Sequence, residues 1–244
     1  FFKQKTAYEI IAGDWSSDVC SSDLGQNHPM PAHGFARKTP WKVTTQETDQ
    51  VQLELTDSDA TRAVFPFAFR YRLTYRLQEG RLHWQQVIEN LSPEPMPFGV
   101  GFHPYLPMPL SAGSKRSDCV IRIPRATRFN PIGRGDAYFS EPFSEQELPA
   151  TVDTGSTLLL GNLRSQELAL VDRAARLEVV VNWEGAPAYR FCALWSRTPS
   201  ENFYCLEPWT CLPNAFSRPE DRELQILAPG QSFQASMWME VRPC

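Results

Sequence analysis

The chain has 244 residues, of which 42% are hydrophobic and 21% are charged, which is the composition of an ordinary globular protein. A formal net charge of -4 gives no basic footprint for nucleic acid or an anionic membrane. No segment approaches the roughly 18 apolar residues of a membrane-spanning helix, and six cysteines without CxxC spacing indicate neither a zinc ribbon nor a compact disulfide framework. We therefore expect a protein of the reducing cytoplasm, with no nucleic-acid or membrane partner.

The N-terminal segment differs from the rest of the chain. Residues 1–24 have neither the basic and apolar regions of a signal peptide nor a helix or strand period. The blocks KQKTAYEI (3–10) and DWSSDVCSSDL (14–24) resemble the translation of a widely used sequencing-library adapter, with residues 11–13 at the place of its barcode. We expect residues 1–24 to be an adapter-derived artefact with no packed role. Residues 25–244 are then expected to form a single domain that lacks its first strands.

Alternating polar and apolar residues begin at Trp41. The segments 41–46 and 51–56 alternate in polarity on either side of a polar turn, which predicts a hairpin. Residues 69–90 form two longer alternating runs around Glu79-Gly80, with Phe69, Tyr71, Leu73 and Tyr75 on one face of the first run. This segment predicts a second, longer hairpin.

The remaining chain continues the same pattern. Further strands are expected at 119–124, 168–172, 177–183, 189–196, 202–207, 224–227 and 233–241, and Pro/Gly/Ser-rich connections at 91–98, 107–115 and 131–136. Neither an amphipathic helix nor an internal repeat nor a break in composition is evident, and 21 prolines with 12% aromatic residues argue against a helical bundle. The sequence predicts an all-β fold, an antiparallel sandwich.

The four histidines can be weighed one by one. His83 lies within an alternating strand, which favours a structural or surface role, and His28 has no informative context. His33 lies in the turn-rich segment PAHGFARKTPW. His103 lies in PFGVGFHPYLPMP, where glycines permit close backbone approach, a proline stiffens the chain and Tyr105 adds aromatic surface. A titratable group beside aromatic rings suits a sugar pocket.

The acidic candidate is Glu207, because it closes the apolar strand NFYCLE and precedes Pro208 and Trp209. Desolvation at such a position raises the pKa of a carboxylate and makes it a better base near neutral pH, although a structural salt bridge is an equally good explanation. Asp153 and Asp172 are turn aspartates by default. The motifs GxSxG, HExxH, GxGxxG and the P-loop are absent. A glycosidase-type pair of carboxylates is possible, but a His/Glu pair is better supported.

Three of these segments together resemble the aldose 1-epimerase family, which includes the galactose mutarotases. They are HGFAR (33–37) with Trp41 four residues on, GFHPYL (101–106) and EPWTCLPNAF (207–216), in that order. The similarity covers roughly residues 29–244 and is greatest to the bacterial branch near the hexose-6-phosphate 1-epimerases. It implies a β-supersandwich and an isomerase that interconverts the α and β anomers of a hexose, without metal or other cofactor.

The resemblance also implies roles for single residues. His103 would be the general acid that protonates the ring oxygen, and Glu207 the general base that takes the proton of the C1 hydroxyl. His33 and Asp153 would bind sugar hydroxyls, with Tyr105 and Trp209 as further substrate-binding residues. Arg37 could contact an anionic group in the phosphate-using branch.

The chain departs from the family pattern at two points. Leu106 stands where the family has an aromatic residue. The family also has an arginine and several strands before the HG segment, so we expect an incomplete site. Two alternatives stay open, a hexose-6-phosphate 1-epimerase and a non-catalytic carbohydrate-binding sandwich.

Overall fold

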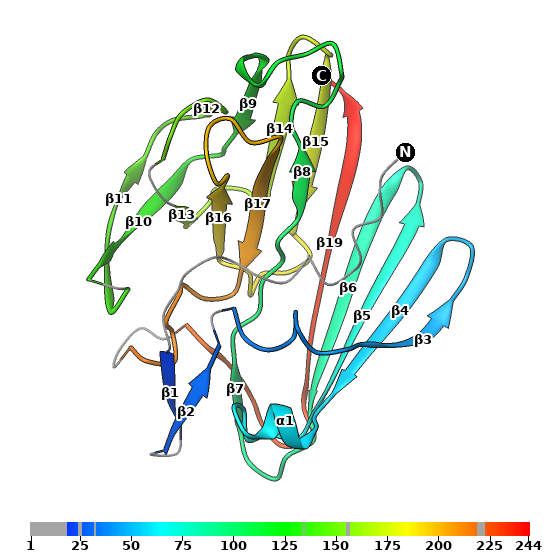
Figure 1. Cartoon of the computed structure of the whole chain (residues 1–244), viewed down its shortest axis with the longest axis vertical. Coiled ribbons are helices and arrows are strands. Elements are labelled where there is room, and N and C mark those ends of the chain that lie inside the picture. The colour runs from blue at the N-terminus through cyan, green and yellow to red at the C-terminus, as the bar shows by residue number, and fades with distance from the viewer. Residues whose placement is uncertain (1–18, 24–25, 32, 134, 155–156, 219–222) are drawn as a thin grey trace.

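Antiparallel β-sheets make up most of the computed structural model, which describes residues 19–23, 26–31, 33–133, 135–154, 157–218 and 223–244 (Figure 1). The larger sheet has nine strands in the order β12-β9-β14-β15-β19-β6-β5-β4-β3. These are β3 (Lys42–Gln46), β4 (Gln50–Thr56), β5 (Phe69–Gln78), β6 (Arg81–Asn90), β9 (Cys119–Arg122), β12 (Glu147–Pro149), β14 (Glu167–Asp172), β15 (Leu177–Asn182) and β19 (Ser232–Pro243).

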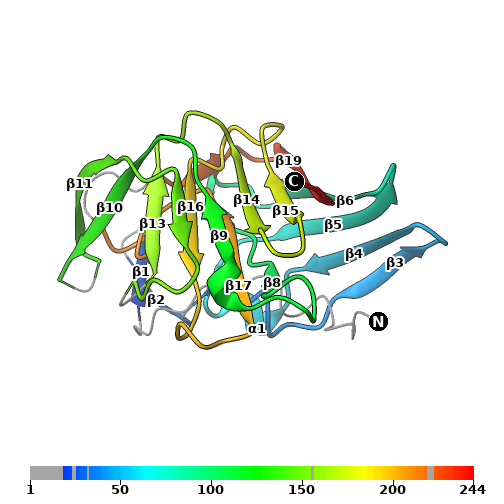
Figure 2. The same ribbon diagram turned by 90° about the horizontal axis from the view of Figure 1, so that it is seen from above.

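The second sheet has six strands in the order β11-β10-β13-β16-β17-β8. These are β8 (Tyr105–Pro107), β10 (Ala126–Ile132), β11 (Ala137–Phe143), β13 (Leu158–Gly161), β16 (Phe191–Trp195) and β17 (Phe203–Trp209). The hairpins β3–β4 and β10–β11 lie at opposite ends of the molecule in both views (Figures 1 and 2). The all-β, antiparallel fold expected from the sequence is therefore confirmed.

Smaller elements complete the structure. β1 (Val19–Asp23) pairs with β2 (Gln26–Met30), β7 (Met96–Phe98) pairs with β18 (Gln225–Leu227), and α1 (Asp59–Arg62) and a 3-10 turn (Arg116–Asp118) are each about one turn long. The backbone of β1 belongs to the segment that resembles an adapter. Residues 1–18 lie outside the described residues, so the expectation that residues 1–24 lack a packed role stays a prediction. Within the described ranges, no helix is both long and apolar enough to cross a membrane.

The two large sheets bury one shared apolar core. Leu160, Leu194 and Leu206 of the six-stranded sheet belong to the same buried cluster as Ile121 and Leu170 of the nine-stranded sheet. Within a strand, the residues that face this core alternate with residues that point to the opposite face of the sheet. On β17 those outward positions carry the candidate site.

The β5–β6 hairpin shows how local sequence sets this arrangement. Glu79 and Gly80 both have positive φ, at 52° and 77°, which is the backbone of a two-residue turn whose twist matches that of the strands. The turn fixes the register, which places Tyr75 opposite Trp84 and Tyr71 opposite Ile88. The face predicted to be apolar on residues 69–75 is buried.

Strand prediction failed at sites where alternation is weak. β7 lies in the segment 91–98, and β10 extends to residue 132, although both stretches were expected to be connections. β10 carries Pro131 and its residues are half-buried on both faces, except for the exposed last one, so it lacks the period that marks a strand facing one core. β13 is a short, fully buried run without alternation, and β8 has only three residues.

Candidate functional site

Strand β17 carries the site on its outer face. Tyr204 and Leu206 point into the shared core, so the alternation of the strand sends Cys205, Glu207 and Trp209 to the opposite face. Glu207 lies opposite Ala193 of β16. That neighbour is small and buried.

His103 reaches Glu207 because the chain before it runs along the end of β17. The amide of Phe102 donates to the carbonyl of Pro208 at 3.0 Å, and Gly101 forms an isolated antiparallel bridge with Trp209. A Cβ atom at Gly101 would collide with the indole of Trp209, so only glycine permits this approach. The role expected for the glycines before His103, close backbone approach, is met at this position.

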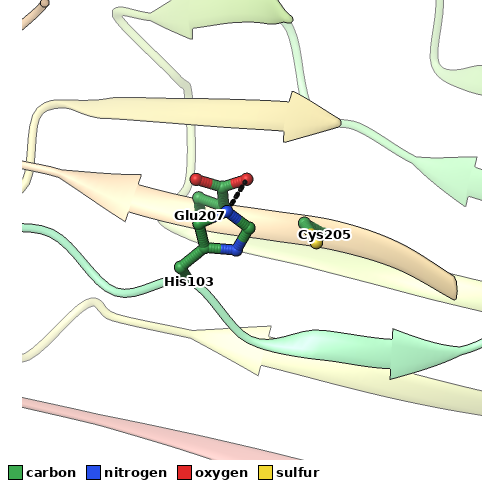
Figure 3. Close-up of side chains that lie close together, drawn as sticks. All are labelled: His103, Cys205 and Glu207. Carbon is green, nitrogen blue, oxygen red and sulfur yellow. Dashed lines mark ion pairs between the residues drawn. The ribbon is translucent and has the colours of Figure 1, made fainter. Parts of the chain in front are cut away.

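The imidazole and the carboxylate face each other in the interior (Figure 3). His103 Nε2 lies 3.4 Å from Glu207 Oε1, and the two side chains are only 3% and 1% exposed. Two titratable groups in contact and shielded from water form the pair that acid/base chemistry requires. Glu207 was expected to be partly desolvated, and its burial is nearly complete.

The surroundings of His103 favour its neutral form. Burial, together with the charges of His33 and Arg37, lowers the pKa of His103 from 6.5 to about 3. An ionised Glu207 in contact acts in the opposite direction, because a carboxylate stabilises an imidazolium. The charge on His103 therefore depends on its partner and on whatever enters the site.

Aromatic rings enclose the pair. Tyr105 stacks on the imidazole of His103 with ring centres 4.7 Å apart and an angle of 3° between the planes. Trp195 meets the same imidazole edge-on at 5.8 Å, and both rings contact Phe203. Tyr105 is 41% exposed, so it forms the boundary between the buried pair and solvent.

A cavity of about 330 Å³ opens next to His103. Its lining is mostly apolar, and the polar groups His33, His103, Trp209 and Asn214 lie among the lining residues. This size falls at the lower end of the range of small-molecule sites, and an apolar wall with a few polar groups is typical of them. His103 is among the described residues that line the cavity and Glu207 is not, so the cavity reaches the pair from the side of His103.

The predicted site residues are gathered only in part. His103, Glu207, Tyr105, His33 and Trp209 lie together, by direct contact or as lining of the same cavity. Arg37 is close enough for its charge to act on His103, and its buried Nε has no hydrogen-bond partner in the part of the chain that is described.

Asp153 is not among the residues that line the cavity. It is exposed in the connection between β12 and β13, so its proposed contact with a sugar stays a prediction. His83, for which a structural or surface role was expected, is half-buried on β6, opposite Trp238.

Sequence reasoning missed Trp195 and Cys205, which lie beside the pair, and Asn214, which lines the cavity. Trp195 and Tyr105 lie opposite Cys205 on the two adjacent strands, which places all three in one row across the sheet. Asn214 has a positive φ of 60° and lines the cavity. The alternation of residues 189–196 put Trp195 on a defined face, but only the register between strands shows what that face meets.

Known proteins resemble this chain in both sequence and fold. The family model for aldose 1-epimerase matches residues 10–240. The Slr1438 protein of Synechocystis is 27% identical, with a TM-score of 0.78 over 96% of this chain and 76% of that one. A galactose mutarotase-like protein of Clostridium acetobutylicum shares the fold, with a TM-score of 0.82 over 97% of this chain and 79% of that one, at 19% identity.

Curated proteins are more distant. The plasmid-encoded protein LacX of Lactococcus lactis subsp. lactis is 25% identical over 193 residues, which are 74% of this chain and 63% of LacX. The uncharacterised protein YphB of Escherichia coli is 24% identical over 221 residues, which are 86% of this chain and 71% of YphB. The chain thus spans 63% of the length of LacX. Its family match extends over most of the described residues, and the chain belongs to the aldose 1-epimerase family.

Proposed function

We propose that the protein is a mutarotase that interconverts the α and β anomers of a hexose, with Glu207 as general base and His103 as general acid. The observation that carries this proposal is the contact of 3.4 Å between the two side chains in a shielded interior. Anomer exchange needs one group that removes a proton and one that supplies it, at the two ends of the O5–C1–O1 unit of the sugar. Each such group contributes about 10²–10⁴-fold to the rate.

The proton transfers form a closed sequence. The carboxylate of Glu207 takes the proton of the C1 hydroxyl, and the imidazolium of His103 gives its proton to the ring oxygen. The C1–O5 bond breaks, its electron pair stays on O5, and C1 becomes the aldehyde carbon. Rotation about C1–C2 presents the other face of the aldehyde, and reclosure returns both protons. The enzyme ends in its starting protonation state, as an equilibration requires.

The sugar must enter between two groups that are in contact in the free protein. Tyr105 stacks on His103 and is exposed, so its displacement is the simplest opening movement. The cavity lined by His33 and Trp209 then receives the remainder of the ring. A carboxylate next to His103 also supplies the charge that the imidazolium needs in a buried site.

Variants of the pair test the proposal. Fresh α-glucose and α-galactose are followed by polarimetry or NMR, with wild type, Glu207→Gln and His103→Gln. Each variant is expected to lose about 10²-fold or more of the catalysed rate. The control is Glu184→Gln, a change of the same kind at an exposed glutamate. An unchanged rate in either site variant would refute the assignment, and sugar binding without any acceleration would indicate a carbohydrate-binding module.

A hexose 6-phosphate is the second candidate substrate, favoured by Arg37. Its buried Nε has no hydrogen-bond partner among the described residues, and its charge acts on His103. A guanidinium in this state suits a phosphate oxygen. For this substrate we expect Arg37→Ala to lower the rate with glucose 6-phosphate far more than the rate with glucose. Equal effects on both sugars would indicate that Arg37 supports the fold or contacts the sugar ring, and does not bind the phosphate.

A further inference from the structure

The acid/base pair has a third neighbour to which the proposed reaction gives no role. Cys205 is two residues before Glu207 on β17, so the strand alternation places both side chains on the same face. One ligand atom each from His103, Cys205 and Glu207 can be chosen so that all three lie within 4.8 Å of one another (Figure 3). All three residues are buried.

The cluster brings together a thiol, an imidazole and a carboxylate. This is a mixed sulfur, nitrogen and oxygen set, of the kind found around zinc in sites where a fourth position stays open. Within the described residues, it is the one group of three such side chains close enough to share an ion. The rings of Tyr105 and Trp195 lie opposite Cys205 on the adjacent strands, and they give the sulfur a largely apolar surrounding.

We propose that His103, Cys205 and Glu207 form a binding site for one thiophilic divalent cation, of which Zn²⁺ is the type. Zinc takes sulfur at about 2.3 Å and nitrogen or oxygen at about 2.0–2.2 Å, so ligand atoms in a tetrahedral site lie roughly 3.3–3.8 Å apart. The contact of 3.4 Å between His103 and Glu207 already has this spacing. The three ligand atoms, which lie within 4.8 Å of one another, need to close by about 1 Å at most to reach this spacing.

The charge balance favours the ion. Binding replaces the thiol proton of Cys205 by the metal and releases that proton to solvent, which leaves a thiolate, a carboxylate and a neutral imidazole around a double positive charge. Mg²⁺ and Ca²⁺ prefer oxygen ligands in larger number, so they are not expected to bind here.

Occupation of the site by a metal would inhibit mutarotation. This consequence rests on the proposed function, because the ion would hold the same imidazole nitrogen and carboxylate that transfer protons. Sugar and metal would then compete. An added chelator would restore the rate, and a saturating sugar would slow metal uptake.

Cobalt is the probe, because Co²⁺ replaces Zn²⁺ in such sites and gives a charge-transfer band when a thiolate binds it. The experiment uses the full chain with Cys244→Ser throughout, since Cys244 is an exposed thiol. Chelator-treated protein is titrated with Co²⁺ and then with Zn²⁺. We expect a thiolate band that saturates at one cobalt per chain, disappears on addition of Zn²⁺ and does not respond to Mg²⁺.

Two cysteine variants locate the metal. Cys205→Ser should remove the thiolate band and weaken Zn²⁺ binding at least about 10-fold, whereas Cys119→Ser, a matched change at a buried cysteine of β9, should retain both. Cys205→Ala serves as a second variant if the serine prevents folding. A band that survives loss of the Cys205 thiol, or no band in the parent protein, would overturn the proposal.

Activity measurements separate the two proposals. If the protein catalyses mutarotation in the presence of chelator and the rate falls at least about 10-fold on saturation with Zn²⁺, both the metal site and the proposed function are supported. A cobalt band in protein that has no mutarotase activity in chelator supports the metal site and refutes the function. Activity in chelator that is unchanged by bound Zn²⁺ overturns the inference that the metal occupies the catalytic pair.

Discussion

Replacement of His103 by glutamine should change how the stability of the fold depends on pH. In the native state, burial and the charges of His33 and Arg37 lower the pKa of His103 to about 3, from 6.5 in the unfolded chain. Below pH 6.5 the unfolded state therefore takes up a proton that the native state does not. Wild type loses stability as the pH falls, and a glutamine at this position, which has no proton to take up, does not share the loss.

The magnitude follows from the two pKa values. Between pH 6.5 and pH 5.5 the free energy of unfolding should fall by about 1 kcal/mol because of this histidine alone. Glutamine fills most of the same volume but packs differently, so the two proteins are compared as a difference in the free energy of unfolding. Relative to that of His103→Gln, the free energy of unfolding of wild type should fall by about 1.4 kcal/mol between pH 7.5 and pH 5.5. Glu207, Cys205 and Tyr105 face the imidazole and are present in both proteins.

Urea unfolding of both proteins at pH 7.5, 6.5 and 5.5 measures this difference directly. A chelator is included so that no metal holds the imidazole. A difference that stays constant over the three pH values, or that changes in favour of wild type as the pH falls, would show that the native pKa of His103 is not lowered. That result would refute the reasoning, because an ionised Glu207 would then govern the charge of the imidazole in the free protein.

Two further substitutions test the packing that positions the site. Gly101→Ala should push His103 away from Glu207, because the new Cβ meets Trp209. A displacement of about 1 Å costs up to about 10²-fold in the rate measured by polarimetry. The control is Gly113→Ala, where a Cβ meets nothing within 4 Å, and this variant should leave the rate unchanged. Leu160→Ala should lower the free energy of unfolding by about 2–5 kcal/mol in urea, since Leu160 is fully buried, whereas the exposed Leu77→Ala should change it by less than about 0.5 kcal/mol. Similar losses in both leucine variants would contradict the assignment of the shared core.

The strands that sequence predicts best are those with one buried and one exposed face. β5 and β6 alternate over ten residues each around a turn with its own signature, and both were located correctly. β13 and β10 were missed for opposite reasons. All four positions of β13 are buried, and nearly all positions of β10 are half-buried. Neither strand therefore shows the alternation that distinguishes a strand from a connection in the sequence.

The site divides in the same way. Glu207 could be singled out because it ends an apolar strand, and His103 because glycines and a proline surround it. Their contact could not be derived, since it depends on the bridge between Gly101 and Trp209, which joins segments far apart in the chain. Cys205 could not be recognised as a third member, because its position relative to His103 is a property of the sheet register.

The attachment of residues 100–102 to the end of β17 also bears on when the site forms during folding. Val100 and Thr210, 110 positions apart in the sequence, exchange hydrogen bonds, and the amide of Phe102 adds another. Closing a loop of that length costs conformational entropy before any local contact compensates for it. The acid and the base therefore meet only after residues 100–102 have attached to β17, and the amides of Val100, Phe102 and Thr210 should gain protection from hydrogen exchange together, late in refolding.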